Sequence, residues 1–161
     1  MKSFRLLIVC SVVLLNSCGF RLHGSASYPP VLANTYINAE DRYTVFYRDF
    51  SATLEQGGIQ LVTSPKDATA VVRIERDQTG QKVLTVSGRN VPAEYDVYYT
   101  ISYSVWVDGM AVLPSRTLSV SQDYTYDETS LLGKNREQEA IRKVIVKDLI
   151  RQVSQELSRL Q

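Results

Sequence analysis

The chain has 161 residues and a formal net charge of +1, from 18 Lys and Arg against 17 Asp and Glu. This length allows one compact domain with a short appendage and excludes a second enzyme-sized domain. Hydrophobic residues make up 44% of the chain and charged residues 22%, which predicts a folded core and excludes a disordered or collagen-like chain. The near-zero net charge gives no general attraction to nucleic acid.

The N-terminal segment has the pattern of an export signal. Lys2 and Arg5 precede an uncharged run over residues 6–15 that is apolar except for Ser11. This run is as long as the core of a signal peptide and well short of the roughly 20 residues of a membrane-spanning helix. The segment therefore predicts export from the cytoplasm.

The residues after this run resemble the lipobox of bacterial lipoproteins. Residues 15–19 read Leu-Asn-Ser-Cys-Gly, and in this pattern the chain is cleaved before the cysteine, here Cys18, which is then acylated. We predict a signal peptide over residues 1–17, an acylated tether over 18–31 and a single α+β domain over 32–161. The alternative is an ordinary signal peptide with a cysteine near its cleavage site.

Cleavage before Cys18 would remove two cations and Cys10, so that 16 Lys and Arg would remain against 17 Asp and Glu. Cys18 would then be the only cysteine, which excludes an internal disulfide and a cysteine-based metal site. His23 is the only histidine of the chain and lies in the tether, away from any folded site. Gly19 stands where many lipoproteins carry the aspartate that retains them in the inner membrane, so we predict the outer membrane.

The first elements of the domain are a short strand and a helix. Residues 35–37 give a weak strand signal. Asp41 is a candidate N-cap, and the Gly57-Gly58 pair ends the pattern. Between them, apolar residues recur at spacings of three and four, which predicts a helix packed on the core. These residues are Tyr43, Phe46, Tyr47, Phe50 and Leu54.

The middle of the chain alternates with a period of two, as strands do. Residues 70–86 predict one long bent strand or two short ones, with a polar bend at Thr79-Gly80. The turn over residues 87–92 carries one cation, Arg89. The next strand is the clearest, because one face is apolar throughout. This face consists of Tyr95, Val97, Tyr99, Ile101, Tyr103, Val105 and Val107.

Asp108-Gly109 predicts a type I′ hairpin turn, after which a partner strand runs to about Tyr124. Pro114 in this strand indicates a bulge or a sheet edge. The last segment predicts a helix that covers the apolar face of the sheet. Its apolar stripe consists of Ile141, Ile145, Leu149, Val153, Leu157 and Leu160, widened by Val144 and Ile150.

This order of elements predicts an α+β fold, a two-layer sandwich of about four mostly antiparallel strands covered on one face by two helices. The chain has no nucleophile elbow, phosphate-binding loop or dinucleotide-binding turn. The pairs Glu75 with Asp77 and Asp127 with Glu128 would suit a glycosidase, but nothing in the sequence brings a second acid opposite either pair. We therefore predict a binding or assembly protein without enzymatic activity, cofactor or metal.

Three motifs together resemble the LptE family of LPS-assembly lipoproteins. They are Cys-Gly-Phe-Arg-Leu at residues 18–22, Arg-Asn leading into Ala-Glu-Tyr over residues 89–95, and Leu-Gly-Lys-Asn at residues 132–135 before the long C-terminal helix. The order of elements agrees over essentially the whole mature chain. This chain lacks the long polar tail of some members, and its central strand has more tyrosine than the family pattern.

The resemblance implies two helices on a four-stranded sheet, no enzymatic activity, and a position as a plug inside the outer-membrane β-barrel LptD. It further implies that basic residues contact LPS, and by position these are Arg89 and Lys134. An arginine fork and a lysine point charge both suit the phosphates of lipid A. The alternative is that both residues are ordinary surface cations.

Tyr98 and Trp106 lie on the otherwise polar face of the central strand. Large aromatic residues on such a face often mark interfaces, so we expect this face to contact the barrel wall. The domain would then lie on the periplasmic side of the outer membrane or inside the barrel. The rival function is a structural or regulatory outer-membrane lipoprotein that serves another barrel or a cell-wall synthase complex.

Overall fold

The structure is a computed structural model that describes residues 28–125 and 131–160, with side chains described from residue 136 onward in the last helix. The predicted signal peptide, Cys18 and most of the tether lie outside these residues. The elements in chain order are η1 (Pro30–Leu32), β1 (Asn34–Ala39), α2 (Val45–Gln56), β2 (Gln60–Leu61), η2 (Pro65–Asp67), β3 (Ala70–Val86), β4 (Pro92–Val107), β5 (Met110–Thr125) and α3 (Leu131–Leu157). Within the described ranges, no helix combines the length and the apolar character needed to span a membrane.

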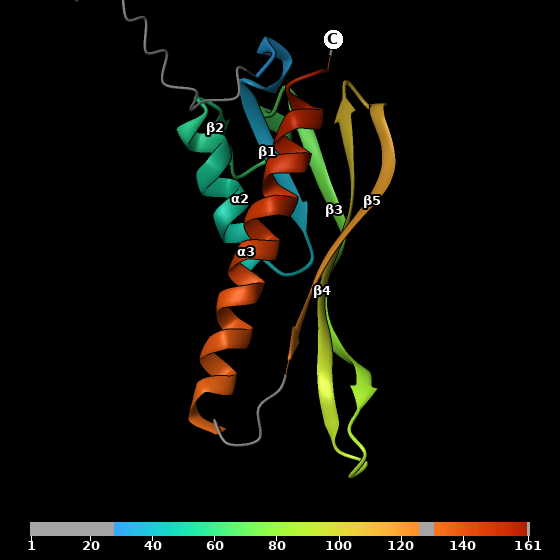
Figure 1. Cartoon of the computed structure of the whole chain (residues 1–161). Coiled ribbons are helices and arrows are strands. Elements are labelled where there is room, and N and C mark those ends of the chain that lie inside the picture. Colours follow the sequence, from blue (N-terminus) through green and yellow to red (C-terminus); the bar gives the residue numbers. More distant parts are fainter. Residues whose placement is uncertain (1–27, 126–130, 161) are drawn as a thin grey trace, which may run out of the picture.

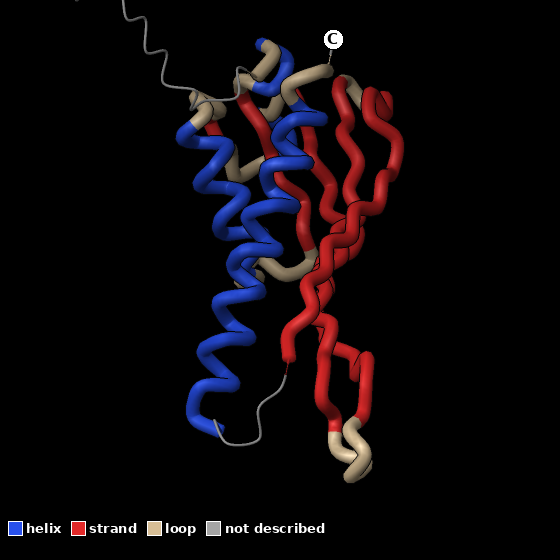
Figure 2. Tube along the Cα trace, viewed as in Figure 1, coloured by secondary structure: helices blue, strands red, loops and turns tan. Residues whose placement is uncertain are grey.

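The predicted α+β class is confirmed: α2 and α3 lie together on one face of a sheet (Figures 1 and 2). The sheet has five strands in the order β2-β1-β3-β4-β5. Sequence reasoning missed β2, which has only two residues, and it did not foresee that β1 runs parallel to β2 and β3. The crossover through α2 makes this parallel pairing feasible. The three long strands are antiparallel, as predicted.

The region from residue 70 to 86 is one strand. Thr79 and Gly80 continue the ladder by pairing with Tyr99 and Tyr98, so the bend predicted there does not interrupt β3. The register instead shifts at three other places along β3, beginning between Ile74 and Arg76. Such irregularities bend a strand without ending it.

The β4–β5 hairpin is confirmed in its turn and its bulge. Asp108 and Gly109 have φ of 49° and 79°, the positive values that a type I′ turn requires. The register then shifts between Tyr103 and Val105, opposite Pro114, and β5 is an edge strand. Pro114 is tolerated here because the bulge and the edge position remove the need for its missing N–H.

The N-cap predicted for α2 was wrong. Thr44 caps this helix, and its hydroxyl accepts the backbone N–H of Tyr47 at 3.1 Å. Asp41 instead accepts the N–H of Tyr43 at 2.7 Å in the preceding loop. Tyr43 is consequently outside the helix and 89% exposed. Of the remaining residues in the predicted stripe, Phe46, Phe50 and Leu54 are fully buried.

The C-terminal helix packs on β4, β5 and α2. Its predicted stripe is confirmed at five buried positions, namely Ile141, Ile145, Leu149, Val153 and Leu157. Val144, which was predicted to widen the stripe, is 59% exposed. Val146 is buried instead, because the core lies along the other side of the stripe. The hydroxyl of Tyr103 donates to Glu156 at 2.7 Å, which fixes the C-terminal end of α3 to the second half of β4.

Candidate functional site

Arg89 lies in the turn that joins β3 to β4, at one end of the molecule (Figure 1). The N–H of Ser87 donates to the carbonyl of Val91 at 2.7 Å, and the N–H of Asn90 donates to Ser87 at 2.9 Å. Asn90 has a φ of 60°, a value that asparagine tolerates better than most residues. Arg89 is exposed and has no ion-pair partner among the described residues. Its guanidinium is therefore free to bind an anion.

Lys134 lies in the first turn of α3, where the structure describes the backbone alone. One turn later, the side-chain amide of Gln138 donates to Gln81 of β3 at 2.7 Å. This bond ties the start of α3 to the part of β3 that leads to Arg89. The start of α3 and the β3–β4 turn thus lie at the same end of the molecule (Figure 2).

The two positions are nevertheless not adjacent. Lys134 precedes Gln138 by about 6 Å along the helix. Arg89 follows Gln81 by eight residues, about 25 Å along the hairpin. A ligand that contacts both Arg89 and Lys134 must therefore be much larger than a single phosphate group.

A buried charge lies on the strands that carry this turn. Asp96 of β4 is 4% exposed, and its Oδ2 is 2.9 Å from Nζ of Lys82 on β3. The hydrogen bond from Lys82 lowers the pKa of Asp96, and the same bond raises the pKa of Lys82. The pair fixes the register between β3 and β4 close to the turn, and Lys82 is thereby engaged while Arg89 has no ion-pair partner within the described part of the chain.

This pair predicts a pH-dependent stability. Because the pKa of Asp96 is lower in the folded protein than its usual value near 3.8, its charge stabilises the fold above that pH, and this stabilisation is lost as the pH falls through the folded value. We expect Asp96→Asn to lower the melting temperature at pH 7, and we expect the difference from the wild type to shrink as the pH falls below 3.8 in thermal unfolding. Asp49→Asn, an exposed position on α2, is the control. Equal melting temperatures at pH 7 would contradict the prediction.

Tyr98 is half-buried on the face of the sheet away from the helices, because its neighbours Val97 and Tyr99 are buried in the core. It pairs with Gly80 on β3. A Cβ on Gly80 would lie 2.5 Å from the hydroxyl of Tyr98. The absence of a side chain at position 80 thus allows the Tyr98 ring to lie across β3.

Trp106 lies on the same face and has polar neighbours. The guanidinium of Arg73 is 4.2 Å from the centre of its ring, and the indole N–H donates to Ser104 at 3.0 Å. Glu75 accepts hydrogen bonds from Ser115 and Ser104, which lower the pKa of its carboxyl group. Trp106 therefore belongs to a fixed polar network on this face.

The structure places Tyr98 and Trp106 on one face but does not bring them together. Trp106 follows Tyr98 by eight residues on β4, about 26 Å along the strand. Hydroxyl pairs between β4 and β5 occupy this interval, from Thr100 to Ser119 at 2.9 Å and from Ser102 to Thr117 at 2.8 Å. The uncovered face is thus a hydroxyl-rich surface with an aromatic residue toward each end.

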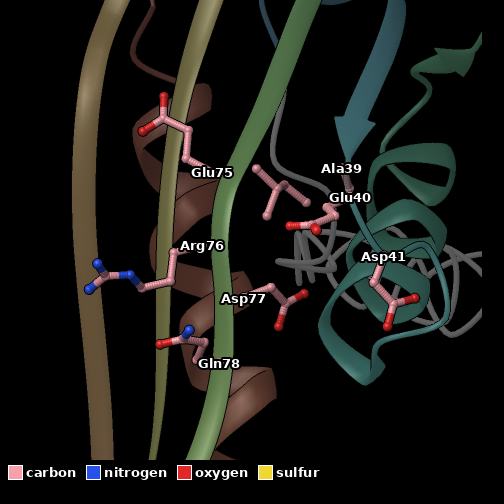
Figure 3. Close-up of a pocket in the computed structure, with 8 residues that line it drawn as sticks. Ala39, Glu40, Asp41, Glu75, Arg76, Asp77 and Gln78 are labelled. Carbon is pink, nitrogen blue, oxygen red and sulfur yellow. The ribbon is translucent and has the colours of Figure 1, made fainter.

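A hollow of about 270 Å³ lies where β1 ends beside β3 (Figure 3). Glu75 and Asp77, the acidic pair considered from the sequence, do not face one another as a catalytic pair (Figure 3). Glu75 points to one side of β3, and Asp77 points to the other, toward Asp41 (Figure 3). Asp77 accepts the hydroxyls of Tyr99 at 2.6 Å and Thr44 at 2.5 Å, and burial together with Asp77 raises the pKa of Tyr99.

Over the described residues, no cluster of His, Cys, Asp and Glu is arranged to hold a metal ion. The second acidic pair considered from the sequence, Asp127 and Glu128, lies outside the described residues. Sequence reasoning missed the network of Arg73 and Glu75 around Trp106. Period-two alternation places Arg73 on one face of its strand, but the register against β4 cannot be read from alternation.

The model of the LptE family, described as lipopolysaccharide-assembly, matches residues 32–157 of this chain. The chain belongs to the LptE family. The match begins in η1 and ends with the last residue of α3, so it includes Arg89, Lys134 and the whole sheet. The family that the motifs of the sequence indicated is thereby confirmed.

Two LptE-family relatives are LPS-assembly lipoproteins by name. The protein of Yersinia enterocolitica is 26% identical over 139 residues, which cover 85% of this chain and 66% of that protein. The protein of Pectobacterium atrosepticum is 23% identical over 161 residues, which cover 98% of this chain and 84% of that protein. This chain spans about two thirds of the length of the Yersinia protein.

Solved structures support the fold. The NMR structure of uncharacterized lipoprotein B from Nitrosomonas europaea has a TM-score of 0.73 at 18% identity, covering 87% of this chain and 90% of that chain. The crystal structure of a minor lipoprotein from Acinetobacter baumannii has a TM-score of 0.66 at 20% identity, covering 81% and 93%. At these identities the likeness shows a shared fold.

Proposed function

We propose that this LptE-family chain is an outer-membrane lipoprotein that occupies the lumen of the barrel LptD and contacts LPS on its way to the outer leaflet. The observation that carries the proposal is the family match over residues 32–157, a domain that presents an exposed, unpaired Arg89 at one end. The role is one of assembly and binding rather than catalysis. Two carboxylates of the hollow beside β1, those of Glu75 and Asp77, accept hydrogen bonds from hydroxyls, which suits that role.

The chemistry of the β3–β4 end supports contact with LPS. The exposed guanidinium of Arg89 can bind a phosphate through two parallel hydrogen bonds, and Lys134 can add a second positive charge at the same end of the molecule. LPS is large enough to reach both positions, whereas one phosphate group is not. Both residues are therefore proposed as LPS-binding residues.

The uncovered face of the sheet supports contact with the barrel. Both helices lie on the opposite face (Figure 1), so β3, β4 and β5 present a broad surface lined with hydroxyls. Tyr98 and Trp106 are half-buried on this surface, where large aromatic residues often anchor an interface. We propose that this face lies against the inner wall of LptD.

The anchor is proposed at Cys18, which lies outside the described residues. We expect mass spectrometry of the mature protein to show a chain that begins at Cys18 and carries acyl groups, because several acyl chains give stable membrane attachment. Cys10→Ser should leave this mass unchanged, since that residue belongs to the predicted signal peptide. A mature chain with an unmodified Cys18, or one found in the soluble periplasmic fraction, would contradict the anchor.

Co-purification tests the proposed partner. Capture of the tagged full-length chain from outer membranes in a mild detergent should recover LptD in amounts comparable to the bait. Trp106→Ala combined with Tyr98→Ala should reduce this recovery without unfolding the domain. Recovery of a different barrel or of a cell-wall synthase, with no LptD, would favour the alternative function and contradict the proposal.

A further inference from the structure

Three apolar side chains are exposed at the end of β3 that leads to the turn. Val83 is 47% exposed, Leu84 is 43% exposed and Val86 is 59% exposed. They lie within four residues of one another, whereas the apolar residues at the other end of β3, Ala70 and Val72, are almost completely buried. A cluster of exposed apolar residues on one short segment marks an interaction surface.

The backbone explains why these side chains are not covered. The register between β3 and β4 shifts between Val83 and Thr85 and again between Thr85 and Val86, so Leu84 has no register partner. Pairing with β1 ends at Ile74, and β3 forms the edge of the sheet beyond it. An exposed apolar edge is an aggregation hazard that proteins usually avoid with charges, so its presence here indicates a function.

Charge decides which ligand suits this surface. Arg89 follows Val86 by three residues and has no ion-pair partner among the described residues, while Lys82 is already paired with Asp96. Among the described residues, this surface combines apolar side chains with the free cation of Arg89, and the carboxylate of Glu94 on β4 is engaged by the hydroxyl of Thr85 at 3.1 Å. An amphiphile with acyl chains and a phosphate complements both features.

The other exposed apolar pair of the described strands, Met110 and Val112, provides a contrast. These residues are 68% and 41% exposed and follow Asp108 in the β4–β5 turn, so the adjacent charge there is negative. An anionic amphiphile would be repelled at that end. The charge pattern favours the β3–β4 end.

We propose that Val83, Leu84 and Val86 contact the acyl chains of an anionic glycolipid while Arg89 binds its phosphate. This inference rests on the proposed function, and it extends the LPS contact from the phosphate groups to the acyl chains. The β3–β4 end would thus bind both parts of the lipid A portion. Lys134 would contact a more distant part of the same molecule.

The experiment compares two probes: purified LPS, and LPS from which the acyl chains have been removed with the phosphates retained. For Leu84→Ser combined with Val86→Ser in the full-length chain, we expect about tenfold weaker binding to LPS, which corresponds to about 1.4 kcal/mol. Binding to deacylated LPS should be unchanged. Arg89→Ala should weaken binding to both probes. Met110→Ser combined with Val112→Ser is the matched control and should change neither.

Circular dichroism and the melting temperature establish that each variant is folded, and Val86→Thr provides a variant of nearly unchanged shape with a smaller effect in the same direction. Unchanged LPS affinity in the folded double variant would overturn the acyl-chain contact while the proposed function stands. Equal loss of binding to phosphatidylglycerol vesicles would show a general membrane contact and would also overturn it. A wild-type chain that binds neither LPS probe would contradict the proposed function itself.

Discussion

Replacing Leu149 with alanine should lower the free energy of unfolding by about 2 to 5 kcal/mol. Leu149 is completely buried in α3, in the core between this helix and the sheet. The substitution removes apolar contacts and leaves a cavity that the surrounding side chains fill only in part, and both effects destabilise the fold. Urea unfolding followed by circular dichroism measures the change directly.

Val144→Ala is the matched control, because Val144 is on the same helix but 59% exposed. We expect its effect to be below about 0.5 kcal/mol. An unchanged unfolding midpoint for Leu149→Ala would show that α3 does not cover the sheet in solution. The proposal that the uncovered face of the sheet lies against LptD would then also fail, since the position of α3 defines which face is uncovered.

Reversing both proposed LPS-binding charges should weaken LPS binding about 100-fold in the variant that combines Arg89→Asp with Lys134→Asp. Each substitution removes an attraction to phosphate and adds a repulsion. Arg89 is exposed in a turn and Lys134 is in the first turn of α3, outside the apolar stripe, so folding should be retained. Titration of purified LPS, with circular dichroism as a check on folding, measures the effect.

Arg48→Asp combined with Lys66→Asp is the control, because it changes the net charge equally at exposed positions away from the β3–β4 end. We expect the control to bind LPS nearly as well as the wild type. If both double variants lose affinity equally, net charge rather than a defined site governs binding. If the Arg89 and Lys134 variant retains full affinity, these residues are not LPS-binding residues.

The C-terminal helix shows what the spacing of apolar residues can predict and what it cannot. The spacing of four in α3 correctly predicted Ile145, Leu149 and Val153 as core residues. It could not decide which flank of the stripe is covered, because that depends on how the helix lies over the sheet. Val144 was therefore predicted to be buried, while the buried residue is Val146.

In the sheet, a feature set by adjacent residues was predictable, whereas a pairing between distant segments was not. The Asp108-Gly109 turn was predictable because its conformation is a property of two adjacent residues. The parallel pairing of β1 with β3 joins Thr35 to Ala70 across the whole of α2, and no local pattern specifies such a partner. Strand β2 was missed because two residues carry no periodicity.

The candidate site was predictable only in part. The position of Arg89 in a turn followed from the residues around it, and period two placed Tyr98 and Trp106 on one face. The distance between Tyr98 and Trp106 also followed from their separation along one predicted strand. The exposure of Leu84 and Val86 was not, because an apolar strand pattern gives no information on whether another element covers it.

The amount of newly made LPS that reaches the outer leaflet tests the proposed function most directly. In cells depleted of this chain, we expect surface LPS to fall and LPS to accumulate at the inner membrane. A wild-type copy should restore transport, and a copy with Arg89→Asp and Lys134→Asp should restore it poorly. Unchanged delivery of LPS to the outer leaflet in fully depleted cells would contradict a role in LPS assembly.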